Sequence, residues 1–221
     1  MRRRFAAVVV TAVAATTVAL AGSPAAAGAN DDEALAKQAL LRASDLPDSW
    51  EADESADPDQ DDPAEGRVPE CEDIEAAMDK GDKSPHADSP QFDDGDDPNG
   101  IASVSNEVFV FPKAKGAKRY LAPFKADEAA DCLLGRAEVI PNILDAELVD
   151  LDVAGAGTDG VGYSALLTFD NEGVPFTLAV DVVVVRVGRG IVTFAAENAD
   201  EPLPIGPDLL RAVTDRLEEA L

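Results

Sequence analysis

Apart from its carboxylates, this chain has few residues that could carry out chemistry. Its 221 residues include one histidine, His86, and two cysteines, Cys71 and Cys132, beside 44 aspartates and glutamates. A Ser–His or Cys–His nucleophile would need His86, which lies in a polar, proline-flanked stretch that we expect to form a loop. Carboxylate pairs occur throughout so acidic a chain and identify no acid–base centre. We therefore predict no catalytic residues, no cofactor and a protein that is not an enzyme.

The pattern of possible metal ligands is equally poor. Two cysteines and one histidine are too few for a convincing zinc site. Asp57, Asp59 and Asp61 have the spacing that begins an EF-hand loop, but Asp62 and Val68 replace the glycine and glutamate that such a loop needs. We predict no metal site and interpret the acidic runs as solvated charge, with weak cation binding as the alternative.

The first thirty residues have the layout of a secretion signal. Three arginines at 2–4 precede an apolar run at 5–21, and small residues follow it. We expect the signal peptide to span 1–27, ending at Ala27, with Ala29 as the alternative end. A lipoprotein signal would have cysteine in place of Ser23, so we expect no lipid anchor. These features predict a secreted or cell-envelope protein, with no membrane association after cleavage.

The two cysteines both follow this signal. In an exported chain an even number of cysteines favours a disulfide, and Cys71 and Cys132 are the available pair. Their bridge would connect a short helix that follows the acidic tract to the helix that precedes the sheet.

Charge limits the possible partners. The formal net charge is −26, and nucleic acid is excluded because phosphate contacts need lysine and arginine on one face. Residues 51–70 are acidic and proline-containing with almost no apolar residue, so we expect a disordered linker there. A second polar stretch at 81–100 is expected to be a loop.

Hydrophobic periodicity predicts an α+β domain at 71–221, preceded by an N-terminal helix within 30–50. We expect a mostly antiparallel, twisted sheet of about five strands, covered by helices on one side. The helices are expected at 31–47, 71–81, 113–136 and 206–221. The strands are expected at 101–112, 144–153, 159–170, 174–189 and 190–198.

Two details of the sheet bear on function. The strand at 174–189 is apolar on both faces, which indicates a central strand that is covered on both sides or lines a cavity. Asp181 interrupts its valines, and we expect it to reach the strand edge or to pair with a basic side chain such as Arg186, the alternative being a polar anchor in a pocket. The Gly-rich stretch 155–160 is interpreted as a turn between strands, since a strand follows where a dinucleotide site needs a helix.

Four stretches carry a family resemblance: "LLRASDLPDSW", "VFVFPKAKGAKRYLAPFKADEAADC", "GAGTDGVGYSALLTF" and "VDVVVVRVGRGIVTF". Together they resemble the actinobacterial sensor-like domains typified by the extracellular domain of the mycobacterial kinase PknH. The resemblance implies a helix-covered antiparallel sheet with a cleft for a ligand, and no catalytic residues. We therefore expect a non-catalytic binding or sensor-like module for a small, apolar envelope molecule or envelope component. A small secreted hydrolase and an extracellular protein-interaction domain are the alternatives.

Overall fold

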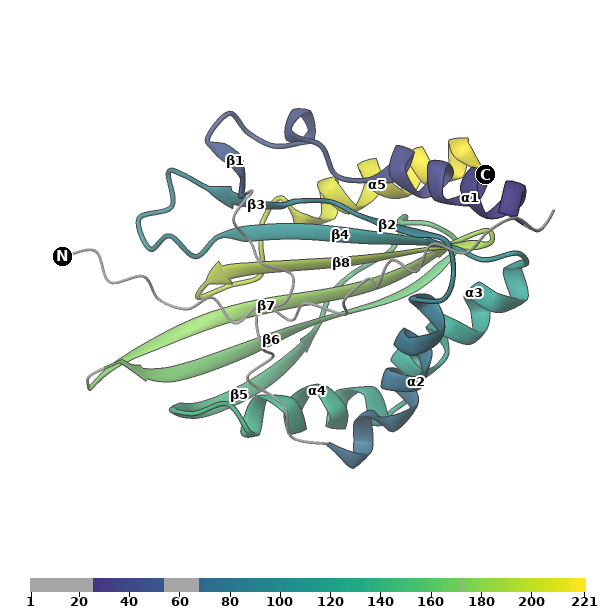
Figure 1. The fold of residues 1–221 in the computed structure, drawn as a ribbon. Helices are drawn as coiled ribbons and strands as arrows, with labels where there is room; N and C mark the ends of the chain where they lie inside the picture. Colours follow the sequence, from purple (N-terminus) through teal and green to yellow (C-terminus); the bar gives the residue numbers. More distant parts are fainter. Residues whose placement is uncertain (1–25, 54–67, 172) are drawn as a thin grey trace.

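The computed structural model describes residues 26–53, 68–171 and 173–221. Within them the chain forms an α+β domain around one eight-stranded sheet, whose order is β1-β3-β4-β8-β7-β6-β5, with β2 paired to β4 beside β3 (Figure 1). The described strand pairs are all antiparallel. The strands are β1 (Trp50–Asp53), β2 (His86–Asp88), β3 (Gln91–Asp94), β4 (Ser103–Val110), β5 (Ile143–Asp150), β6 (Asp159–Asn171), β7 (Val174–Val187) and β8 (Gly190–Ala199). The helices are α1 (Ala26–Ala39), α2 (Glu72–Gly81), α3 (Ala114–Leu121), α4 (Glu128–Glu138) and α5 (Gly206–Ala220), with 3₁₀ turns η1 (Ala43–Asp45), η2 (Pro69–Cys71) and η3 (Pro123–Lys125).

The long strands in the centre follow from local sequence. β7 is rich in valine, whose branched side chain fits a pleated sheet, and it pairs along its length with β6. Gly188 and Arg189 form the two-residue turn from β7 to β8, and Gly188 has φ of +56°, a conformation that favours glycine.

Helices cover both faces of the sheet. On one face α1 and α5 pack together over a core that includes Val183, Val185 and Val187 of β7. On the other face α3 packs over Val184 of β7 and Ile191 of β8. On the same face α2 lies beside α3, and α4 lies against β5 and β6 (Figure 1). The prediction of helices on one side only was wrong. The alternation of valines on both faces of β7 already required two apolar layers.

The prediction of about five strands was also wrong, because the three short strands β1, β2 and β3 were missed. β2 and β3 lie in the stretch 81–100 that was expected to be a loop. Each contributes one buried apolar side chain, Ala87 and Phe92, among polar residues, so no alternation of useful length is visible. Both pair with the edge of β4, and that pairing supplies the order that the local sequence does not predict.

The N-terminal helix is shorter at its C-terminal end than expected. α1 ends at Ala39 because the next N–H groups find other partners: Leu41 donates to Asn106 Oδ1 at 2.8 Å, and Arg42 donates to Asp45 Oδ2 at 2.9 Å. β1 then occupies the start of the predicted linker 51–70, whose residues 54–67 lie outside the described part.

The predicted signal peptide falls mostly outside the described residues, at 1–25. The two candidate cleavage positions, Ala27 and Ala29, lie in the first turn of α1, and cleavage stays a prediction. In the described part of the chain, every helix is too short or too polar to cross a bilayer.

Candidate functional site

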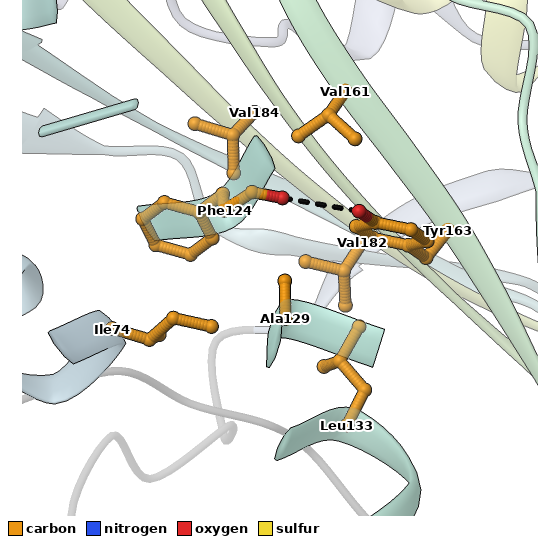
Figure 2. A pocket seen from close by; sticks show the side chains of 8 residues that line it. All are labelled: Ile74, Phe124, Ala129, Leu133, Val161, Tyr163, Val182 and Val184. Carbon is orange, nitrogen blue, oxygen red and sulfur yellow. Dashed lines mark hydrogen bonds between the residues drawn. The ribbon is translucent and has the colours of Figure 1, made fainter. Parts of the chain in front are cut away.

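A small cavity lies between the sheet and the helices of the second face (Figure 2). Its volume is about 30 Å³. The sheet contributes side chains of β6 and β7, and the helices contribute side chains of α2, η3 and α4. The lining residues are Ile74, Phe124, Ala129, Leu133, Val161, Tyr163, Val182 and Val184.

The cavity wall is apolar because alternate residues of two neighbouring strands point into it. Val161 pairs with Val184 and Tyr163 pairs with Val182 in the β6–β7 register, so the four side chains share one face. The Tyr163 hydroxyl donates a hydrogen bond of 3.1 Å to the carbonyl of Phe124 (Figure 2). This bond satisfies the one polar side chain of the lining and leaves an interior suited to an apolar group.

We call α2, η3 and α4 the cap. The Cys71–Cys132 disulfide joins the start of α2 to α4, with a Cα–Cα distance of 4.8 Å, which confirms the predicted bridge. Arg136 of α4 also forms an ion pair with Glu75 of α2 at 3.0 Å. The cap is therefore tied together internally. It meets the sheet through apolar side chains such as Ile74 and through an ion pair between Lys125 of η3 and Asp159 of β6.

Two carboxyl groups lie on the same face of the sheet as the cavity but outside its lining. Removal from water raises the pKa of Glu107 on β4 to about 9, and the charges of Asp88 and Asp82 add to the effect. Removal from water also raises the pKa of Glu197 on β8 to about 8, with a contribution from Asp93. Both carboxyl groups therefore hold a proton at neutral pH in the absence of a positive partner.

His86 does not lie in a loop, as the sequence had suggested, but on β2. There it lies beside Asp88 and Glu107, and one ligand atom of each residue lies within 4.8 Å of the others. Sequence reasoning missed this group. The spacing of His86 and Asp88 places both on one face of a strand, but Glu107 joins them only through the β2–β4 pairing.

The remaining residues considered in the sequence have structural roles. Asp181 is buried on the face of α1 and α5, where its Oδ2 accepts the N–H of Leu203 at 2.9 Å, and burial raises its pKa. The expectation of a basic partner was wrong, since Arg186 donates to the Gly188 carbonyl at 3.1 Å. The Gly-rich stretch leads into β6, which confirms a turn between strands.

The acidic stretch between β3 and β4 binds its own backbone. Asp97 Oδ2 accepts the N–H of Ile101 at 2.6 Å and that of Ala102 at 3.0 Å, and its Oδ1 accepts the N–H of Asn99. These bonds make it a connection stabilised by Asx-type turns.

Comparison of the chain with models of known protein families, and with curated proteins, finds no match. The fold defines an α+β protein with an antiparallel sheet covered on both faces.

Proposed function

We propose that this chain is an exported, non-catalytic binding module that takes a small apolar molecule between the cap and the sheet. The observation that carries this proposal is the cavity of Figure 2, which is lined by apolar side chains from two layers. Ligand sites typically combine such an apolar lining with a few polar groups. The resemblance to actinobacterial sensor-like domains supports the same class of function.

The volume of the cavity determines how a ligand would enter. About 30 Å³ is close to the space that one or two water molecules need, whereas ligand pockets span about 300–1,000 Å³. A ligand must therefore displace the cap from the sheet. The disulfide and the Arg136–Glu75 ion pair would keep α2 and α4 together during such a movement.

The charge of the protein restricts the ligand. A net charge of −26 repels anionic amphiphiles. When the cap moves, the Tyr163 hydroxyl that now donates to Phe124 becomes available to a ligand oxygen. The ligand class that fits is a neutral, largely apolar molecule with a hydrogen-bond acceptor.

Fluorescence titration with N-phenyl-1-naphthylamine, a neutral dye that becomes bright in apolar surroundings, tests the proposal. We expect saturable binding of one dye per chain. The substitution Ala129→Leu fills the cavity from α4 and should abolish binding. Ala34→Leu, the same change at an exposed position of α1, should leave it intact. Absence of saturable binding, or equal binding by a folded Ala129→Leu protein, would contradict the proposal.

A further inference from the structure

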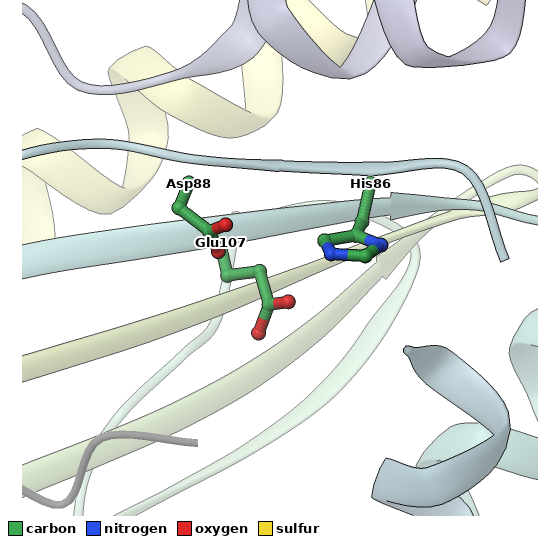
Figure 3. A group of neighbouring side chains, drawn as sticks. All are labelled: His86, Asp88 and Glu107. Atoms are coloured by element: carbon green, nitrogen blue, oxygen red, sulfur yellow. The ribbon is translucent and has the colours of Figure 1, made fainter. Parts of the chain in front are cut away.

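His86, Asp88 and Glu107 form a cluster (Figure 3), and none of them lines the cavity. Strand geometry brings them together. His86 and Asp88 are two residues apart on β2, so both side chains emerge on the same face, while Ala87 between them is buried on the other. Asp88 lies directly opposite Glu107 in the antiparallel register. The cluster is therefore fixed by two paired strands.

The histidine is oriented as a ligand. Its Nδ1 lies 2.9 Å from the carbonyl oxygen of Ser84. A carbonyl oxygen can only accept, so Nδ1 carries the hydrogen and the neutral ring keeps a lone pair on Nε2. Metal-binding histidines are commonly held in this way, with the second ring nitrogen donating to a carbonyl or carboxylate. The ring also packs beside Phe109, with 5.6 Å between centroids.

The two carboxyl groups lie against each other: a side-chain hydrogen bond joins Asp88 to Glu107, and His86 supplies the favourable charge that acts on Asp88. Among the described residues, neither Asp88 nor Glu107 forms an ion pair with lysine or arginine. Asp82, which follows α2, adds further negative charge to the surroundings of both Glu107 and Asp88. Crowded carboxylates of this kind are stabilised either by a proton or by a cation. A divalent cation placed between them would satisfy both groups at once.

We propose that His86, Asp88 and Glu107 bind one divalent transition-metal ion of the zinc class. One imidazole nitrogen with two carboxylate oxygens is a donor set that Zn²⁺ accepts, whereas Mg²⁺ and Ca²⁺ prefer oxygen alone. In a tetrahedral zinc site the ligand atoms lie about 3.3 Å apart. The ligand atoms, which now lie within 4.8 Å of one another, would therefore have to approach by up to about 1.5 Å when the ion binds. Three protein ligands leave the fourth position to water.

This site shares no residue with the lining of the apolar cavity. Its residues come from β2 and β4, whereas the cavity lies between the cap and β6 and β7.

Isothermal titration of the chelator-treated full chain with Zn²⁺ at pH 7 tests the proposal. We expect one stoichiometric site with a dissociation constant in the micromolar range. Asp88→Asn preserves the shape of an exposed side chain and should weaken Zn²⁺ binding at least tenfold. His86→Ala and Glu107→Gln should do the same. Glu197→Gln, which removes a carboxylate elsewhere on the same face, serves as the matched control and should leave the affinity unchanged.

Several results would overturn the proposal. One is the absence of a stoichiometric Zn²⁺ site. Another is an unchanged isotherm in Asp88→Asn. Binding of Ca²⁺ as tightly as Zn²⁺ would also overturn it, because it would show that acidic charge alone, without the imidazole, holds the ion. Co²⁺ gives a separate reading: visible d–d bands that disappear in a folded His86→Ala protein would support the nitrogen ligand, and unchanged bands would contradict it.

Discussion

Removal of the disulfide should destabilise this protein through the unfolded chain. Cys71 and Cys132 are 61 residues apart, and the bridge restricts that loop when the protein unfolds. On the chain-entropy relation, a loop of this length corresponds to about 4 kcal/mol of unfolding free energy at 25 °C. For a domain of this size the loss corresponds to a fall in melting temperature of about 8–16 °C. We therefore expect a large effect from a bond that joins two parts of the cap and no strand of the sheet.

Urea unfolding followed by circular dichroism measures this effect. The double substitution Cys71→Ala/Cys132→Ala removes the bridge and two buried sulfur atoms, which adds about 1 kcal/mol per atom. The reduced wild-type protein keeps the sulfur atoms and isolates the contribution of the bridge. We expect a loss of about 4 kcal/mol on reduction and about 6 kcal/mol in the double variant. A loss below about 1 kcal/mol on reduction would refute the argument.

The position of the bridge adds a local expectation. Because it joins two parts of the cap, its reduction should accelerate amide hydrogen exchange in α2 and α4 before it affects β8 in the centre of the sheet. Faster exchange in β8 than in α4 would show that the cap is not a separable unit.

Three further predictions concern the core. Because burial raises the pKa of Glu197 from 4.5 to about 8, the folded state binds its proton more tightly than the unfolded state, and stability is lost as pH rises between these two values. Glu197→Gln should remove on the order of 3 kcal/mol of that loss in urea titrations at each pH; an unchanged pH slope would contradict it. Val182→Ile adds one methylene to the cavity wall and should raise the unfolding free energy by up to about 0.8 kcal/mol. The same change at the more exposed Val149 should have no effect. If Val182→Ile destabilises the protein and Val149→Ile does not, the cavity cannot accept the added group. Arg216→Lys should cost about 1–2 kcal/mol in thermal unfolding, because it breaks the bidentate ion pair with Asp45 at 2.8 and 2.9 Å, and an unchanged melting temperature would contradict this.

The sequence predicted the elements that a local pattern of residues is sufficient to define. Valines that alternate on both faces of β7 and the apolar spacing of α5 were sufficient to place these elements. The count of cysteines was sufficient for the bridge, because only one pair exists. Each of these inferences needs no knowledge of what packs against the element.

The elements that depend on distant partners could not be predicted in this way. β2 contains one buried alanine between His86 and Asp88, and it is ordered by pairing with β4. The same pairing creates the cluster with Glu107, so the candidate metal site and the missed strand have one cause. The lining of the cavity likewise depends on how the cap meets β6 and β7, which no local pattern specifies.

The central claim is that a small apolar molecule binds between the cap and the sheet. Intermolecular nuclear Overhauser effects between bound N-phenyl-1-naphthylamine and the protein methyl groups test it most directly. The account predicts contacts to Val182, Val184 and Leu133, which line the cavity from both sides. Contacts confined to exposed methyl groups, such as those of Leu144 and Val174, would contradict it.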